Sequence, residues 1–193
     1  MKVFAVIVTF NRLHLLIKVL DSIRKQSYAV DEIVVVNNDS SDGTKEWLDD
    51  QTGITIIHQA NLGGAGGFSA GMRYAYENGA DWIWTMDDDV FPESDALDEL
   101  LNNTGLSSCL VPSRFYSDNI YCNWGGVYDL KRRRLILGTR PRDHKMPRPI
   151  SFVNTCCFEG MLISRKIVEY IGFPDPRFFI SGDDTIYGLL ASQ

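Results

Sequence analysis

The chain has 193 residues, of which 45% are hydrophobic and 23% are charged, and its formal net charge is −6. This length and composition predict one globular domain with its own core, spanning residues 1–193. The acidic balance argues against a nucleic-acid partner, and no stretch approaches the ~20 apolar residues that a membrane-spanning helix needs.

The first half of the chain, residues 1–105, alternates between strand and helix patterns. Buried strands are predicted at Lys2–Thr9, Glu32–Val36, Ile54–His58 and Asp81–Met86. Helices are predicted between and after them, marked by Leu16 with Leu20, Trp47 with Leu48, Met72 with Tyr76, and Leu97 with Leu101. This alternation predicts an α/β fold with a mostly parallel central sheet and helices on both faces. Ligands of such sheets bind outside the carboxyl ends of the strands.

The second half, residues 106–193, departs from this regular alternation. Strands are predicted at Cys109–Pro112, Tyr121–Leu130 and Phe152–Ser164, and a helix near Ile167–Ile171. Between them, the proline-rich segment Pro141–Pro149 is typical of a loop.

Charge and cysteine usage give two further expectations. Segment 131–148 carries eight basic residues and one acidic residue, in an otherwise acidic chain. It is interpreted as a solvated loop, or alternatively as a surface for acceptor phosphates or for peripheral membrane contact. The cysteines at positions 109, 122, 156 and 157 lack zinc-site spacing and are expected to be reduced thiols. We therefore expect a cytoplasmic protein, at the inner face of the plasma membrane if the basic segment contacts lipid.

Three adjacent carboxylates, Asp87, Asp88 and Asp89, follow the fourth predicted strand. They repel one another unless a cation compensates their charge, and oxygen ligands select hard ions such as Mn²⁺ or Mg²⁺. If the triplet keeps strand-like alternation, Asp87 and Asp89 point to the same side and hold the metal, while Asp88 points elsewhere. Such an ion would neutralise a departing diphosphate. The alternative is an acidic turn before Pro92.

Two further features of the first half suit a nucleotide. The glycine-rich run from Asn61 to Gly67 opens a helix, where a ligand can approach the backbone and anions are favoured. It follows the third strand rather than the first, so it is not a dinucleotide fingerprint, and a tight turn is an equal alternative. Asp39, at the second strand's end, can accept bonds from ribose hydroxyls or a base N–H, or can serve as a turn residue. Arg12 could pair with phosphate or lie on the surface.

A second acidic pair, Asp183 and Asp184, lies near the end of the sequence. Transfer to a hydroxyl group needs a general base, which one of two neighbouring carboxylates can supply. A helix start with dipole-compensating acids is the alternative. Trp124, beside two glycines, is a candidate for stacking on a sugar.

Together these clusters resemble family 2 glycosyltransferases of the GT-A fold, with motifs similar to galactofuranosyltransferases and related bacterial polysaccharide enzymes. The motifs, in the family's order, are VIVTFNR at 6–12, VVVNNDSSDGT at 34–44, NLGGAGGFSAGM at 61–72, WTMDDDVFPE at 84–93 and FFISGDDTIYGL at 178–189.

The resemblance implies an inverting transfer from a UDP- or dTDP-sugar to a glycan or lipid-linked acceptor, in cell-wall or surface polysaccharide synthesis. It assigns Asp184 as the base and Asp183 as the residue that orients the acceptor, and it assigns Asp87 and Asp89 to Mn²⁺ or Mg²⁺. The residues it implies for nucleotide-sugar binding are Thr9, Asn11, Arg12, Asp39, Asn61, Gly63, Gly64 and Asp88. The acceptor side is expected to include Trp124, Glu159 and Gly160.

The sequence departs from the family pattern after the last motif. Members commonly continue with a helix and often a metal-binding His, whereas this chain ends at Gln193, and it reads GLLA at 188–191 where the subgroup usually reads GLRA. Residues 106–193 are therefore expected to form a C-terminally shortened acceptor-side half, beside a nucleotide-binding half at 1–105.

Two other functions are open at this stage. A sugar-1-phosphate nucleotidyltransferase would need a glycine-rich loop after the first strand, and the stretch from Thr9 to Arg12 has no glycine. A fragment that binds nucleotide-sugar without turnover is the other alternative.

Overall fold

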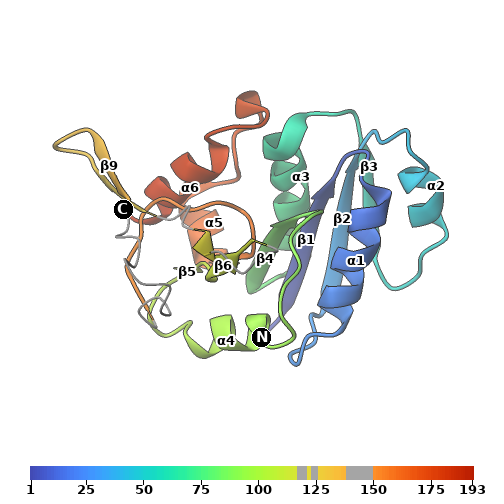
Figure 1. The fold of residues 1–193 in the computed structure, drawn as a ribbon, viewed down its shortest axis with the longest axis horizontal. Helices are drawn as coiled ribbons and strands as arrows, with labels where there is room; N and C mark the ends of the chain where they lie inside the picture. The colour runs from blue at the N-terminus through green and yellow to red at the C-terminus, as the bar shows by residue number, and fades with distance from the viewer. Residues whose placement is uncertain (117–120, 123–125, 138–149) are drawn as a thin grey trace.

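A six-stranded sheet forms the centre of the protein, which is described here from a computed structural model covering residues 1–116, 121–122, 126–137 and 150–193. The strands lie in the order β3-β2-β1-β4-β10-β5 (Figure 1). Their bounds are β1 Val3–Thr9, β2 Glu32–Asn38, β3 Thr55–Gln59, β4 Trp82–Asp87, β5 Cys109–Leu110 and β10 Met161–Ser164. The four strands from the first half are parallel, and β10 runs antiparallel to both β4 and β5. The predicted α/β fold with a mostly parallel sheet is confirmed.

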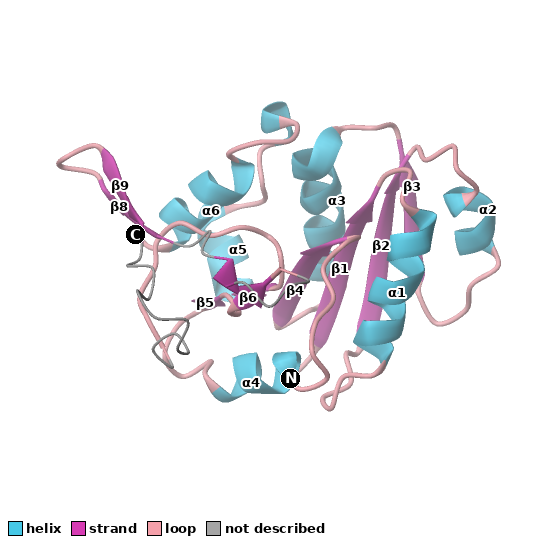
Figure 2. Ribbon diagram, in the orientation of Figure 1, coloured by secondary structure: helices cyan, strands magenta, loops and turns pink. Residues whose placement is uncertain are grey.

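Helices cover both faces of this sheet, as predicted (Figure 2). On β1, Val3, Ala5 and Ile7 join one buried cluster, whereas the alternate side chains join the other. The first cluster includes residues of α1 Leu13–Arg24, α2 Thr44–Asp49 and α4 Ala96–Asn102. The second includes residues of α3 Gly63–Glu77, α5 Arg165–Ile171 and α6 Asp183–Ala191. A strand buried on both faces cannot alternate polar and apolar residues, which explains the continuous apolar run at the start of the sequence.

Helix α3 packs unusually close to β1 because glycines face the strand. A Cβ atom on Gly67 would lie 2.4 Å from Cγ1 of Val8, and one on Gly71 would lie 2.4 Å from Cγ1 of Val6. The glycines of this motif therefore serve helix–sheet packing. The packing holds the N-terminus of α3 beside the carboxyl end of β1.

The second half is built from shorter pieces than predicted. Two small hairpins pair β6 Arg114–Phe115 with β7 Tyr121–Cys122, and β8 Gly126–Asp129 with β9 Arg134–Leu137. The β8–β9 hairpin projects from the body of the protein (Figure 2). The strand predicted over 121–130 is thus two short strands, β7 and β8, from different hairpins.

Two sequence predictions in this half are wrong in part. The strand predicted over 152–164 is confined to β10, because Thr155 bridges to Gly126 and Gly160 has a φ of +86° that interrupts an extended chain. The basic segment 131–148 begins as the turn and second strand of the β8–β9 hairpin rather than as a loop, while 138–149, with its prolines, lies outside the described residues. Within the described ranges, no helix has the length and apolar character needed to cross a membrane.

Candidate functional site

The three polar clusters predicted at strand ends come together at one edge of the sheet. Strand β1 lies between β2 and β4, with Thr9 opposite Asn37 and Val8 opposite Asp87. The loops that follow these strands are therefore neighbours, as their parallel order requires.

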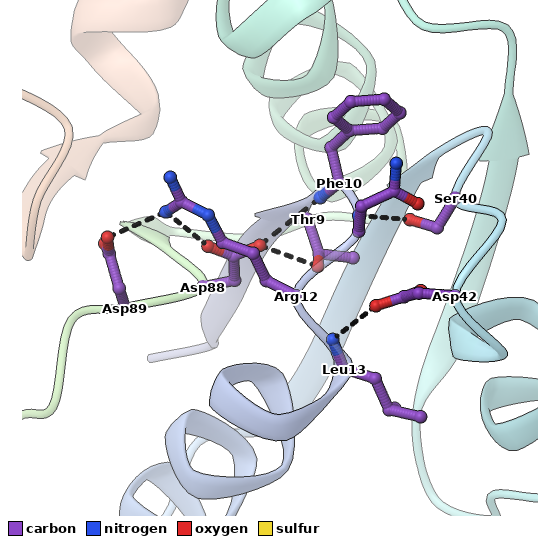
Figure 3. A network of polar contacts seen from close by, with 9 residues as sticks. Thr9, Phe10, Arg12, Leu13, Ser40, Asp42, Asp88 and Asp89 are labelled. Atoms are coloured by element: carbon purple, nitrogen blue, oxygen red, sulfur yellow. Dashed lines mark hydrogen bonds and ion pairs between the residues drawn. The ribbon is translucent and has the colours of Figure 1, made fainter.

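Asp88 joins the loop after β4 to the loop after β1 (Figure 3). Its carboxylate is only 4% exposed and accepts hydrogen bonds from Thr9 Oγ1 at 2.7 Å, the Phe10 backbone N–H at 3.3 Å and Arg12 Nη1 at 3.3 Å. Burial raises the pKa of Asp88, and the bonds from Thr9 and Arg12 oppose that rise. Its burial leaves little of the Asp88 carboxylate accessible for the predicted direct contact with a nucleotide.

Asp89 forms an ion pair with the same guanidinium, that of Arg12. Nη1 of Arg12 lies 2.8 Å from Oδ2 of Asp89, and both side chains are about half exposed. The strand-like alternation predicted for the triplet is wrong, because β4 ends at Asp87 and the next two residues form a turn closed by Val90 N–H and Asp87 C=O at 3.4 Å. This turn lets Arg12 reach two successive carboxylates.

Asp87 lies in a strongly acidic environment. Burial, and then the negative charges of Asp89, Glu159 and Asp88, raise the pKa of Asp87 to about 7, against the opposing effect of Arg12. The segment before β10, which carries Glu159, therefore adds negative charge near the end of β4.

Glu159 is fixed by contacts of its own and of its neighbour Gly160. Its carboxylate pairs with Arg114 of β6. The Gly160 N–H donates to the carbonyl of Thr85 at 2.8 Å, and its own carbonyl accepts from Trp84 Nε1 at 3.1 Å. A Cβ on Gly160 would meet Pro112 at 2.8 Å, so this position needs glycine for space as well as for its φ.

The two C-terminal aspartates occupy the first turn of α6, where the helix dipole favours acids. Asp183 is buried, and burial together with the charge of Asp184 raises the pKa of Asp183. Asp184 is more exposed. The pKa of the Cys157 thiol is raised to about 12, first by burial and then by the charges of Glu159 and Asp184. The negative charges of Glu159 and Asp184 therefore influence the same thiol, that of Cys157.

The glycine-rich run contacts the segment before α6. Asn61 Oδ1 accepts from the Gly63 N–H at 2.9 Å, while the Ala65 N–H donates to the carbonyl of Phe179 at 3.0 Å. Phe179 has φ +61° and ψ −71°, and Ile180 N–H bonds to Phe178 C=O at 2.8 Å, so Phe179 is the centre of a strained γ-turn. The Ala65 amide, at the start of α3, is therefore used inside the protein.

Asp39 lines a cavity of about 250 Å³ at the ends of β2 and β3. The other lining residues are Asn37, Ser40, Lys45, His58, Gln59 and Ala60. Asp39 has a φ of +60°, a conformation that Asp tolerates better than most residues. Asn11 connects the loop after β2, which borders this cavity, to the loop after β1, because its Oδ1 accepts from the Ser41 N–H at 2.7 Å.

Lys45 and His58 received no role from the sequence. His58 lies opposite Asn37 in the sheet, with Nδ1 3.1 Å from Asn37 Nδ2 and Nε2 3.0 Å from Asp49 Oδ1. Strand register is the signal that could have found it. Trp124, predicted on the acceptor side, lies outside the described residues.

The residues of this site fit a metal ion whose coordination is completed by phosphate oxygens of a bound substrate. In the described part of the chain, no three His, Cys, Asp or Glu side chains are grouped closely enough to hold an ion alone. Mg²⁺ and similar ions usually take one or two carboxylates together with substrate phosphates. Asp87 and Asp89, whose charges repel each other, could serve as such a pair of carboxylates.

The sheet order, with antiparallel β10 beside the acidic end of β4, defines the GT-A class of α/β folds. S. aureus TarS 1-349 in complex with UDP has the same fold, with a TM-score of 0.69, 13% identity, and coverage of 97% of this chain and 54% of the TarS 1-349 chain. The mannosyltransferase PcManGT from Pyrobaculum calidifontis, in complex with GDP-Man and Mn²⁺, gives a TM-score of 0.62 and 22% identity, covering 96% of this chain and 50% of PcManGT.

The chain belongs to glycosyl transferase family 2, whose model matches residues 4–172. Among curated proteins, galactofuranosyltransferase GlfT1 from Mycolicibacterium smegmatis is 33% identical over 192 residues, covering 94% of this chain and 62% of GlfT1. The chain thus spans about three fifths of that relative's length. This membership confirms the predicted resemblance and decides against a nucleotidyltransferase.

Replacing Gly63 by Ala is expected to destabilise the protein by about 2–4 kcal/mol. Gly63 has a φ of +71°, and the added Cβ would lie 2.1 Å from the carbonyl oxygen of Phe179. Gly64→Ala is the matched control, because no described heavy atom lies within 4 Å of the Cβ it would add. Urea unfolding measures both; equal stability of the two variants would contradict the contact between Gly63 and Phe179.

Asp87→Asn is expected to stabilise the metal-free protein at pH 8 by about 2 kcal/mol, allowing for solvent screening. The folded-state pKa of about 7 is above the ordinary 3.8, so ionisation of Asp87 disfavours the folded state increasingly from pH 4 to pH 7. Near pH 4 the advantage of the variant should disappear. Thermal unfolding in EDTA across this range measures the effect, with exposed Asp50→Asn as control. A pH-independent difference would contradict the raised pKa.

Proposed function

We propose that this chain is the donor-binding and catalytic part of an inverting, metal-dependent glycosyltransferase. It transfers a sugar from a UDP- or dTDP-sugar to a hydroxyl group of a glycan or lipid-linked acceptor, in cell-wall or surface polysaccharide synthesis. The observation that carries the proposal is that Asp39 and the Asp87–Asp89 turn follow neighbouring strands of the sheet, where the segment of Glu159 is bonded to β4 and the segment before α6 is bonded to the start of α3.

The nucleoside end of the donor is assigned to the cavity beside Asp39. Its volume of about 250 Å³ suits a pyrimidine base rather than a whole nucleotide-sugar. The carboxylate of Asp39 can accept from a base N–H, and Lys45 supplies a cation at the same rim. Thr9 and Asn11 hold the neighbouring loop in place. The UDP complex of the structurally similar TarS supports a uridine donor.

The diphosphate is assigned to the turn after β4. Asp87 and Asp89 would hold Mn²⁺ or Mg²⁺, which when bound neutralises charge on the departing diphosphate. The Mn²⁺ complex of PcManGT supports this assignment. Asn61, Gly63 and Gly64 stand beside the same edge, and the open side of Gly64 is the part of their backbone best suited to approach a ligand.

The acceptor hydroxyl is assigned to Asp184. Asp184 would take its proton as the oxygen attacks the anomeric carbon from the side opposite the diphosphate, which inverts the configuration. Asp183 is buried at the same helix start and orients Asp184 and the acceptor. Glu159 and Gly160, with Trp124 as predicted, complete the acceptor side. The galactofuranosyltransferase name of the GlfT1 relative makes UDP-galactofuranose the first donor to test.

The basic charge of the β8–β9 hairpin favours a reaction at a membrane surface. The exposed residues 131–134 at the tip of the β8–β9 hairpin carry four basic side chains, which would suit peripheral contact with anionic lipid at the cytoplasmic face of the plasma membrane. A lipid-linked acceptor would be presented there.

Donor binding is tested by thermal unfolding. UDP with Mn²⁺ at 100 times its Kd is expected to raise the melting temperature by about 5 °C, because a ligand bound only by the folded state stabilises it. Asp89→Ala should lose the part of the shift that depends on Mn²⁺. A dTDP panel distinguishes the pyrimidines, and the absence of any nucleotide response would refute the proposed donor site.

The role of Asp184 is tested by Asp184→Asn. Transfer from UDP-galactofuranose should fall by at least about 100-fold, since the variant cannot accept the acceptor proton. The thermal shift with UDP and Mn²⁺ should persist, because Asp184 is on the acceptor side. Retained transfer would assign the base elsewhere. If the unchanged chain binds UDP but neither transfers nor hydrolyses the donor, it is a binding unit without turnover.

A further inference from the structure

The guanidinium of Arg12 lies between two of the three aspartates in the turn after β4 (Figure 3). A single nitrogen, Nη1, is 2.8 Å from Asp89 Oδ2 and 3.3 Å from Asp88 Oδ1. Arg12 precedes α1, and its backbone carbonyl accepts from the N–H groups of Leu15 and Leu16 at 3.0 Å. The side chain is half exposed, so it can move without disturbing the start of the helix.

The contact between Arg12 and Asp89 places a positive charge beside a carboxylate that the proposed metal would use. Two cations within a few ångströms repel each other, and a carboxylate oxygen engaged by a guanidinium is a weaker metal ligand. A divalent ion on Asp87 and Asp89 therefore competes with Arg12 for Asp89 and favours displacement of the guanidinium.

The turn is built to survive that displacement. Asp88, the buried member of the triplet, keeps its bonds to Thr9 Oγ1 and the Phe10 N–H when Arg12 moves. A freed guanidinium at this edge would face the diphosphate, an anion whose geometry it matches.

We propose that Arg12 is an internal counter-cation that exchanges Asp89 for the donor diphosphate when the metal binds. The inference rests on the proposed function. Before ligands arrive, Arg12 neutralises the acidic turn and lowers its affinity for a free ion. With nucleoside diphosphate present, Arg12 has a second anionic partner, so the displacement is less unfavourable. Arg12 thereby couples the binding of metal to the binding of nucleotide, and the coupling is reciprocal.

Mn²⁺ titrations of the full chain, followed by electron paramagnetic resonance with and without UDP, test this exchange. Arg12→Ala is expected to bind Mn²⁺ alone roughly fivefold more tightly than the unchanged chain, the upper range for a partly exposed ion pair. The increase in Mn²⁺ affinity caused by UDP should be smaller in the variant. Arg12→Gln, which keeps most of the side-chain stem, should behave like Arg12→Ala. Lys18→Ala is the control, because it removes one exposed positive charge from α1.

The outcomes separate this inference from the proposed function. If the unchanged chain binds no Mn²⁺ with or without UDP, the metal-dependent function fails and the exchange fails with it. If it binds Mn²⁺ with UDP but both Arg12 variants bind the free ion no more tightly than the unchanged chain, only the exchange is overturned. A gain in Lys18→Ala equal to that of the Arg12 variants would reduce the effect to net charge and also overturn it.

Discussion

The hydrogen bonds of Asp88 are the interaction on which the rest of the site depends. A carboxylate at the end of a strand that is buried on both faces needs donors, and the Thr9 hydroxyl and Phe10 N–H supply them from a loop 79 and 78 residues away in sequence. These bonds fix the turn after β4 against the loop after β1. They thereby hold Asp87 and Asp89, in the turn after β4, close to Arg12, which follows β1 and precedes α1. Without these two donors, only Arg12, at 3.3 Å, would compensate the buried carboxylate, and the two segments would lose their main connection.

A second connection joins the donor half to the acceptor half. The strained γ-turn at Phe179 gives its carbonyl to the N-terminus of α3, and Gly63 leaves room for it. Four residues later the chain enters α6 with Asp183. Strain of this kind persists only where surrounding contacts determine the backbone. The glycine-rich motif therefore positions the aspartates of α6, a structural role beside any contact with a ligand.

The first half of the fold could be predicted because its signal is local. The apolar run from Val3 to Val8, rich in β-branched residues, is typical of a strand buried on both faces, and parallel order then brings the strand ends together. The rest depends on contacts distant in sequence. The partners of Asp88, the register that sets His58 against Asn37, and the Phe179 carbonyl on α3 leave no periodicity to find. In segment 152–160, a bridge to Gly126 overrides an apolar sequence that suits a strand.

The triplet itself shows why residue type alone does not assign roles. Three identical side chains in succession have three environments: Asp87 is partly buried and close to other negative charges, Asp88 is satisfied by donors from the end of β1, and Asp89 is half exposed and paired with Arg12. Each environment comes from a different neighbour: the segment before β10 that carries Glu159, the β1 loop, and solvent. A metal gains most where charge is least compensated, which favours Asp87 and then Asp89 over Asp88. The compensation of each charge, rather than the direction of each side chain, thus distinguishes the three residues.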